Sequence, residues 1–328
     1  MAFFGMRFDF RNPPFAGTTM TERYRTGLEM AQWADELGFL MVVLSEHHAS
    51  PDGYLPSPLV MAAAVAARTR RMRIMVSAIV APLHDPLRLA EDAAVVDLIS
   101  GGRLDLVLAN GYVADEFAMF DVAMSARPQR TTAAVETLRR AWTGDEFEFE
   151  GRAVRVTPTP DRSGGPGLSL GGSTPAAARR AARIADGFVP SLPEVWTFYR
   201  DERVALGHAD PGPYMGPGIG NFYLTEDVER GWREVGQYFM HETNAYGKWM
   251  SDAGLDGMYA QAVDVDTVRA QGMYRELTPD MLLAEIEAAG PFAFVLLHPM
   301  LGGIPPELAW RAMRLFEHDV LGRLDGAS

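Results

Sequence analysis

The stretch MRIMVSAIVAPLHDPLRLAEDAAVVDLISGGRLDLVLA, residues 72–109, decides the fold class. It begins with MRIMVSAIV, which predicts a strand. A helix follows, because Asp85 is suited to cap its N-terminus, Pro86 takes the first helical position, and the residues SGG at 100–102 end it. RLDLVLA, residues 103–109, then predicts a second strand. The stretch is therefore a strand–helix–strand unit.

The same alternation of strands and helices runs along the chain. Further strands are predicted at residues 4–10, 39–44, 168–170, 187–189, 219–224 and 292–297, and further helices at Thr21–Leu37 and Ser57–Arg68. Eight strand–helix units in one direction predict an α/β fold of the (β/α)8 TIM-barrel class with insertions. We expect a single domain over residues 1–328. A doubly wound parallel sheet is the main alternative.

Two segments depart from this repeat. Residues 144–167, GDEFEFEGRAVRVTPTPDRSGGPG, alternate in polarity like a small hairpin and then become rich in turn residues. Residues Tyr246–Leu277 are rich in Gly, Met and Tyr and lie between the seventh and eighth predicted strands. Because barrel active sites are built at the C-terminal ends of the strands, we expect this second insertion to lie over the mouth of the barrel.

Composition limits the class of partner. The net charge is −13, and no run of Lys or Arg forms a phosphate-binding stripe, which argues against nucleic acid and against an anionic membrane surface. The chain has no cysteine, so disulfides, thiolate metal sites and a Cys nucleophile are excluded. Lys248 is the only lysine. No apolar run is long enough for a signal peptide or a membrane span, and we expect a cytoplasmic protein that acts on a small molecule.

Residues with chemical potential follow several predicted strands. Glu46, His47 and His48 come directly after the apolar run FLMVVL, at the strand end where barrel enzymes hold catalytic groups. Taken alone, one histidine could cap the next helix while the other is solvated. Three further strand ends carry groups of the same character, in the sequences VSAIVAPLHDP, ANGYVADEF and GGSTP. This repetition favours an active site.

The sequence GGSTP, residues 171–175, has the pattern of an anion site. Its two glycines let the backbone approach a ligand, while Thr174 and Pro175 predict the N-cap and the first position of a helix. We expect the amides of Ala176–Ala178 to face an anion at this helix N-terminus. The alternative is an ordinary cap, in which the Thr174 hydroxyl satisfies the helix.

A metal site is not expected at the histidine pair. Glu46, His47 and His48 are adjacent, so they cannot all face one ion on a regular strand, and the spacing of a helical HExxH motif is missing. An imidazole instead suits proton transfer near neutral pH.

Five sequence strings carry a resemblance to a known family. They are SEHH, YLPSPL, HDPLRLAEDAAVVDLISGGRL, NGYVADEF and GGSTPAAARRAARIADGF, in this order and spacing. Together they resemble the luciferase-like flavin monooxygenases, the group around the bacterial luciferase alpha chain. The resemblance implies a barrel that binds reduced FMN and uses dioxygen to oxygenate an organic substrate. It also implies a flavin reductase as the source of reduced FMN.

The resemblance implies roles for particular residues. His47 matches the active-site histidine near the reacting edge of the flavin, with Glu46 beside it. Ser77 and Ala78 match a cis peptide under the flavin ring. The positions that match the other cofactor contacts are Asn110, Gly111 and Tyr112 after one strand and Gly172, Ser173 and Thr174 after another.

The sequence departs from luciferase proper after the fourth strand. Luciferases carry a reactive cysteine there, followed by an arginine that helps to bind phosphate, whereas this chain has Ala109 and Asn110. Aldehyde oxidation with light emission is therefore not supported. Phosphate binding must depend on the GGSTP loop or on an arginine elsewhere.

Residues at other strand ends are candidates for the substrate pocket. They are Phe10, Arg11, Tyr54 and His298, together with Tyr112. Phe10 fits a core position equally well, and Arg11 suits either a substrate anion or a neighbouring carboxylate.

Two alternative functions stay open. Relatives of this barrel use a deazaflavin coenzyme for hydride transfer, which would call for a basic groove for the polyglutamate tail. Other members bind flavin as noncatalytic partner subunits, although the presence of Glu46, His47 and the GGSTP loop argues against that function. The resemblance further implies a homodimer through the second and third helices, where the small residues of LVMAAAVAA, Leu59–Ala67, allow close approach.

Overall fold

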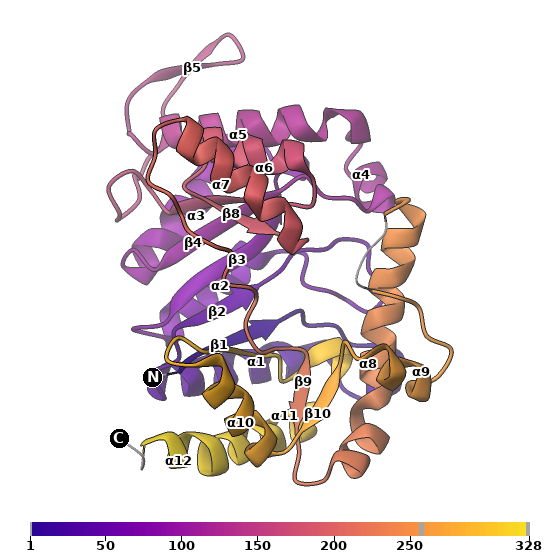
Figure 1. Ribbon diagram of the computed structural model, residues 1–328. Coiled ribbons are helices and arrows are strands. Elements are labelled where there is room, and N and C mark those ends of the chain that lie inside the picture. The colour runs from indigo at the N-terminus through magenta and orange to yellow at the C-terminus, as the bar shows by residue number, and fades with distance from the viewer. Residues whose placement is uncertain (1, 256–258, 326–328) are drawn as a thin grey trace. The chain divides into compact units, whose positions relative to one another are not determined.

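The computed structural model describes residues 2–255 and 259–325 of the chain (Figure 1). Its main sheet has seven strands in the order β11 (Phe294–Leu297), β1 (Phe3–Phe8), β2 (Met41–Leu44), β3 (Arg73–Val80), β4 (Leu104–Ala109), β7 (Gly167–Gly172) and β8 (Gly187–Pro190). The pairs β1/β11, β3/β4, β4/β7 and β7/β8 are all parallel. The predicted alternation of parallel strands and helices is confirmed.

The chain divides into two compact units. Unit 1 consists of Met1–Val42, His48–Pro56 and Pro217–Ser328, and unit 2 consists of Val43–His47 and Ser57–Gly216. The expectation of one domain over residues 1–328 stays a prediction.

In unit 1, β1 pairs with β11 from Phe3 opposite Phe294 to Met6 opposite Leu297. Ile219 forms a parallel bridge with Val295 of β11, and the chain then leaves this pair. β9 (Phe222–Leu224) pairs instead with β10 (Arg275–Leu277) in a separate sheet. The strand predicted at 219–224 is therefore wrong as one continuous element. The physical reason is Asn221, whose φ of 53° is a left-handed conformation that breaks an extended strand.

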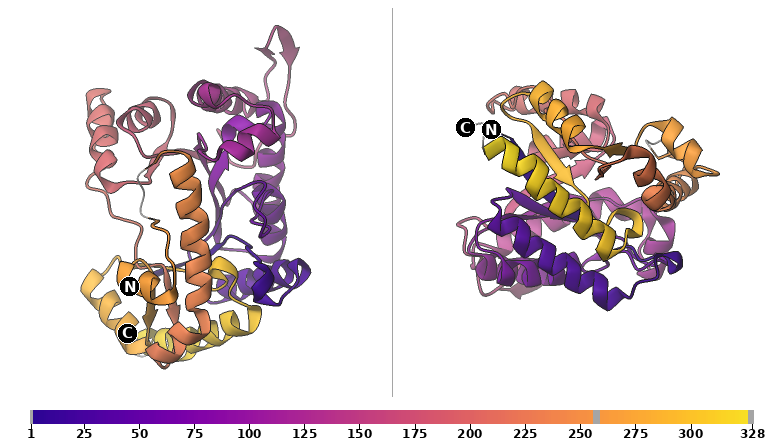
Figure 2. Two further views of the ribbon diagram at one scale, coloured as in Figure 1. Left: turned by 90° about the vertical axis from the view of Figure 1, so that its right-hand side faces the viewer. Right: turned by 90° about the horizontal axis from the view of Figure 1, so that it is seen from below.

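The longest helix of unit 1 is α8, Val228–Asp252 (Figure 2). Its N-cap is Asp227, and near its end the exposed Lys248 pairs with Asp252 at 2.5 Å. The other helical segments of unit 1 are η1 (Pro14–Ala16), α1 (Met20–Glu36), α9 (Val265–Gln271), α10 (Pro279–Ala289), η5 (Leu301–Gly303), α11 (Pro306–Phe316), η6 (Glu317–Leu321) and α12 (Gly322–Asp325).

The predicted insertion Tyr246–Leu277 has structure of its own within unit 1. It contains the end of α8, all of α9 and all of β10. Residues 256–258 of this insertion lie outside the described residues. Its position over a barrel mouth stays a prediction.

Unit 2 contains the strands β3, β4, β7 and β8 and the helices that connect them. The helical segments are α2 (Pro58–Arg68), η2 (Ala81–Leu83), α3 (Pro86–Ser100), α4 (Ala114–Met119), η3 (Met124–Ala126), α5 (Arg127–Ala141), α6 (Pro175–Ile184), η4 (Pro193–Val195) and α7 (Trp196–Ala205). The hairpin expected within residues 144–167 is present as antiparallel β5 (Phe147–Phe149) and β6 (Arg152–Val154), which Figure 1 shows extending away from α5 and α6.

The end signals of α3 act as the sequence predicts. The Asp85 side chain accepts hydrogen bonds from the amides of Leu87 and Arg88, at 2.9 and 3.0 Å. At the other end Gly101 adopts a φ of 64°, which a residue without a side chain reaches at little cost. These two caps fix the length of the helix and so the position of the strand that follows. No helix in the described ranges combines the length and the apolar character of a membrane span.

Arg103, directly before β4, holds the N-terminal side of unit 2 together. Its guanidinium donates hydrogen bonds to four backbone carbonyls, those of Ala66, Thr69, Met72 and Ser100, at 2.6–3.1 Å. It also donates to the Thr69 hydroxyl at 2.8 Å. One side chain thus joins the ends of α2 and α3 to the segment that precedes β3.

We expect Arg103→Ala to lower the free energy of unfolding by about 3 kcal/mol, because several part-buried carbonyls lose a charged donor at once. The matched control is Arg155→Ala at an exposed position, which should change stability by less than about 0.5 kcal/mol. Urea unfolding of both variants measures the difference. Equal stabilities of the two variants would contradict this account of Arg103.

Candidate active site

The structure places the predicted site residues in two groups. Unit 2 holds the predicted catalytic and cofactor residues, which are Glu46, His47, Ser77, Ala78, Asn110, Gly111, Tyr112, Gly172, Ser173 and Thr174. Unit 1 holds the predicted substrate residues, which are Phe10, Arg11, Tyr54 and His298. His48 also belongs to unit 1, so the two neighbouring histidines lie in different units.

Glu46 is a buried carboxylate that ties two segments of unit 2 together. Its Oε2 accepts a hydrogen bond from the amide of Val80 at 2.6 Å, at the end of β3. Its Oε1 lies 2.7 Å from Nε2 of His84. Both oxygens are therefore engaged. His84 was not among the predicted site residues, although it lies in the quoted string HDPLRLAEDAAVVDLISGGRL.

The pKa of His84 reflects this contact with Glu46. Burial lowers the pKa, the hydrogen bond and the charge of Glu46 raise it, and the net pKa is above the ordinary value of 6.5. The pair therefore favours the protonated imidazole more than an isolated histidine would.

His47 is held by a second buried carboxylate. Its Nδ1 lies 2.7 Å from Oε1 of Glu116, a fully buried residue of α4. An ionised Glu116 can only accept, which places the hydrogen of this contact on Nδ1 of His47. The ring of Tyr112 meets the imidazole edge to face, with centroids 5.9 Å apart. Glu116 was not among the predicted site residues either, although it lies in the string NGYVADEF.

The end of β3 has an unusual backbone. The peptide bond between Ser77 and Ala78 is cis, as the resemblance led us to expect. The pairing of β3 with β4 shifts register at this point, between Ser77 and Ile79. Ser77 and Ala78 thus interrupt the regular strand shortly before Val80, whose amide donates to Glu46.

The turn after β4 is closely packed. Gly111 has a φ of 72°, and a Cβ there would lie 2.6 Å from Cγ1 of Val80, so no larger residue fits. Nη1 of Arg127 donates to the carbonyl of Gly111 at 2.7 Å. The side-chain oxygen of Asn110 accepts from Nη2 of Arg180 at 3.0 Å. Arginines of two following helices therefore hold the turn.

The helix after GGSTP is capped by its own residues. The Thr174 hydroxyl accepts a hydrogen bond from the amide of Ala177 at 3.2 Å, and the amide of Ala178 donates to the Thr174 carbonyl at 3.0 Å. The amides of Ala177 and Ala178 thus have partners within the chain, as in the ordinary cap that the sequence also allowed. The physical reason is that the threonine at the N-cap reaches the third helical amide itself.

Arg180 of α6 is a candidate for the phosphate-binding arginine that the sequence left unplaced. It is half-buried, its Nε is buried without a hydrogen-bond partner, and burial lowers its pKa. It lies two turns along the helix that follows GGSTP and contacts Asn110 of the β4 turn. A buried N–H donor on a cation next to two of the predicted cofactor loops fits a phosphate group.

The predicted substrate residues have definite partners in unit 1. Phe10 is fully buried and its ring stacks on Tyr24 with centroids 4.6 Å apart, which is the core position that the sequence also allowed. Arg11 is fully buried, and its Nη1 lies 2.5 Å from Asp52. The hydroxyl of Tyr54 lies 2.9 Å from that of Tyr246.

A parallel α/β fold with the candidate catalytic groups at strand ends is typical of the TIM-barrel oxidoreductases. The sequence profile of the luciferase-like monooxygenases matches residues 4–280. The chain belongs to the luciferase-like monooxygenase family. The resemblance and the fold class expected from the sequence are thereby confirmed.

Individual relatives point to two kinds of coenzyme. The oxygenase component of the flavin-dependent trigonelline monooxygenase of Acinetobacter baylyi is 33% identical over 40% of this chain and 37% of its own length. The F420-dependent glucose-6-phosphate dehydrogenase of Nocardia farcinica is 28% identical over 56% of this chain and 59% of its own length. The chain thus spans well under two thirds of the curated relatives that it matches.

One solved structure matches nearly the whole chain. The monooxygenase RslO1 of Streptomyces bottropensis is 29% identical, with a TM-score of 0.77 over 98% of this chain and 99% of its own. This match therefore includes residues of both units.

We expect the pKa of His84 to fall when Glu46 is replaced by Gln, because the carboxylate that raises it is lost. The protonated pair stabilises the fold below pH 6.5, and this stability is lost as the pH rises through the raised pKa. The gap in melting temperature between the wild type and Glu46→Gln should therefore narrow as the pH increases. NMR titration of His84 measures the first effect and thermal unfolding the second. An unchanged His84 titration would contradict the pairing.

Proposed function

We propose that the protein is a flavin-dependent monooxygenase that uses reduced FMN and dioxygen to oxygenate a small organic substrate. The observation that carries the proposal is the pair of His47 and Glu116, a fixed imidazole in the same unit as all the predicted cofactor residues. Family membership supports the class of reaction. A fold neighbour of 18% identity, the oxygenating constituent of 3,6-diketocamphane monooxygenase, was solved in complex with FMN.

The residues of unit 2 fit FMN. The buried Nε of Arg180 is a donor for the phosphate, and Ser173 and Thr174 lie in the loop before the same helix. Gly111 and Gly172 leave their backbone uncovered by a side chain. A Cβ would lie 2.6 Å from Val80 at the first position and 2.6 Å from Ala177 at the second. When bound, reduced flavin supplies the two electrons with which dioxygen is activated.

The chain's own residues would position the reactants and handle protons. Because Glu116 fixes the hydrogen of His47 on Nδ1, Nε2 is the atom that can accept a proton or a hydrogen bond from a reactant. Tyr112 packs against the same ring and keeps it in place. Glu46 acts through Val80 and His84 and is therefore a positioning residue in this proposal.

Two partners follow from the proposed reaction. The trigonelline relative is named as an oxygenase component, which supports a separate flavin reductase as the source of reduced FMN. A homodimer through α2 and α3 is supported by exposed apolar side chains on both helices, among them Val60, Val95 and Ile99.

Hydride transfer with a deazaflavin coenzyme is the second candidate function. The F420-dependent relative from Nocardia farcinica favours it. The net charge of −13 disfavours it, because the polyglutamate tail of such a coenzyme is anionic. A noncatalytic flavin-binding role is the third, and the His47–Glu116 pair argues against it.

We expect the protein to bind FMN more tightly than riboflavin or FAD, because Arg180 offers a donor to one phosphate and the sequence has no GxGxxG motif for an adenylate half. Arg180→Ala should reduce the preference for FMN over riboflavin by about tenfold, the value of one charged hydrogen bond. Arg179→Ala, at the exposed neighbouring position, is the matched control. Fluorescence titration measures all three ligands, and FAD binding as tight as FMN binding would contradict the single-phosphate site.

We expect His47→Ala to reduce turnover about a hundredfold or more while FMN affinity changes only a few fold, since an acid–base group is lost and no cofactor contact is. His48→Ala should do less, because neighbouring residues that leave a strand point to opposite sides and only one of them can face the pocket centre. Oxygen consumption with reduced FMN measures turnover, and melting temperatures of both variants control for unfolding. Full activity of a well-folded His47→Ala protein would end the catalytic assignment.

A further inference from the structure

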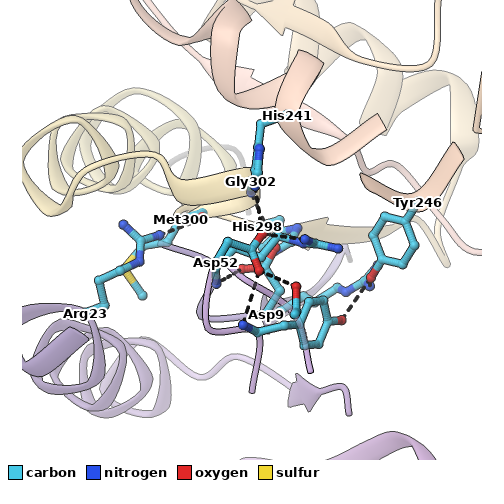
Figure 3. Close-up of polar contacts among 12 residues, drawn as sticks. Asp9, Arg23, Asp52, His241, Tyr246, His298, Met300 and Gly302 are labelled. Carbon is cyan, nitrogen blue, oxygen red and sulfur yellow. Dashed lines mark hydrogen bonds and ion pairs between the residues drawn. The ribbon is translucent and has the colours of Figure 1, made fainter. Parts of the chain in front are cut away.

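A buried cluster of polar residues in unit 1 contains three of the residues predicted for the substrate pocket (Figure 3). We call it the Arg11 cluster, and it consists of Arg7, Asp9, Arg11, Asp52, Tyr54, Glu242, Tyr246 and His298. In Figure 3 the side chains of Asp9, Asp52 and His298 lie close together. The cluster is built at the ends of β1 and β11 and on α8.

The two aspartates of the cluster are well satisfied. Asp9 accepts hydrogen bonds from the amides of Arg11 and Gly302, at 2.9 and 3.3 Å. Asp52 takes donors from Arg11 at 2.5 Å and from His241 at 2.7 Å. Although burial raises the pKa of Asp52, these partners hold it well below its ordinary value. Asp52 is therefore held as an anion, and both carboxylates already have donors from the chain.

Arg11 is only partly satisfied. Its side chain is 0% exposed, and Nη1 is engaged by Asp52. The rings of Tyr54, Tyr246 and Trp249 lie 4.8–4.9 Å from its central carbon. Nε and Nη2, the two nitrogens of one edge of the guanidinium, are buried and have no hydrogen-bond partner. Two parallel N–H donors on one edge match the two oxygens of a carboxylate.

Two titratable groups of the cluster are neutral near pH 7. Burial and the charge of Asp9 raise the pKa of Glu242 to about 8, against the opposing effect of the arginines. Burial lowers the pKa of His298 to about 3. At neutral pH, therefore, Glu242 is largely protonated and His298 is uncharged.

The remaining charges do not cancel. Arg7, Arg11 and Arg23 act electrostatically on His298 and supply three positive charges. Asp9 and Asp52 supply two negative charges. With Glu242 protonated, these five residues leave one positive charge in excess in a buried region, where an uncompensated charge is costly. One monoanion would remove the imbalance.

A metal ion is the competing ligand. Asp9, Glu242 and His298 present donor atoms that all lie within 4.8 Å of one another. A divalent cation there would add two positive charges to a region that already has an excess. The charge balance therefore favours an anion.

We propose that the Nε–Nη2 edge of Arg11 binds one carboxylate group of a small molecule. This binding site does not depend on the proposed oxygenase function. Arg7, whose Nε is also buried and without a partner, adds a second donor in the same cluster.

Two stacked tyrosines link the cluster to a cavity. Tyr246 is hydrogen-bonded to Tyr54 and stacks on Tyr259 with ring centroids 4.6 Å apart. Tyr259 in turn lines a cavity of about 530 Å³, together with Gly247 and Gln261.

The test uses benzoate as the probe and benzamide as its uncharged counterpart, on the full chain without flavin. We expect saturable binding of benzoate by calorimetry and at least a tenfold weaker affinity for benzamide. Arg11→Lys should weaken benzoate at least tenfold, because a lysine keeps the charge beside Asp52 but has no paired N–H edge. The exposed Arg25→Lys is the matched control and should bind benzoate like the wild type.

The affinity for benzoate should fall as the pH rises through about 8, because ionised Glu242 then supplies the missing negative charge itself. Glu242→Gln, which stays uncharged, should bind benzoate with little change over the same range. This second variant keeps the test decisive if Arg11→Lys does not fold.

Three outcomes would overturn the proposal. The first is no benzoate binding at about 10 mM, a concentration that reveals even very weak sites. The second is equal benzoate binding by the wild type and Arg11→Lys, and the third is stabilisation of the protein by Mn²⁺ with no effect of benzoate. Because flavin is absent from these measurements, their result is independent of the FMN and oxygen experiments. Benzoate binding without oxygenase activity would leave the site standing while the proposed function fails.

Discussion

The carboxylate of Glu46 is the constraint on which the candidate active site of unit 2 depends. It holds the amide of Val80, and through Val80 it fixes the end of β3 just after the cis peptide. Val80 is also the residue that a side chain at Gly111 would strike, so the turn after β4 packs against a position that Glu46 has set. A buried carboxylate can do this because each oxygen accepts a separate donor and neither is left to water.

Local signals in the sequence were sufficient to predict most of the helices and strands. The caps of α3 involve residues within a few positions of one another, and they were predicted correctly from Asp85, Pro86 and the glycines that follow. The break at Asn221 was not predicted. Nothing in the alternating pattern of residues 219–224 distinguishes one strand from two short segments joined by a left-handed residue. The hairpin was found because its turn residues lie between two alternating runs.

The candidate site was predicted less completely, for a physical reason. His47 and Glu46 could be singled out because they follow an apolar strand, but their partners Glu116 and His84 are 69 and 38 residues away in sequence. Only the parallel arrangement of the strands brings such residues together. The GGSTP loop shows the opposite difficulty, since one sequence pattern predicts both an anion site and a self-satisfied cap, and the position of a single hydroxyl separates them.

Lysine usage gives the protein a practical property. Lys248 is the single lysine of the chain, its side chain is 67% exposed, and it lies on α8 a short distance from Glu242 and Tyr246 of the Arg11 cluster. An amine-directed fluorophore would therefore attach to one side chain, apart from the chain terminus, without any engineered residue. The helix α8 would then carry both the fluorophore and part of the buried cluster. The emission of the fluorophore could therefore follow local opening of α8 in solution.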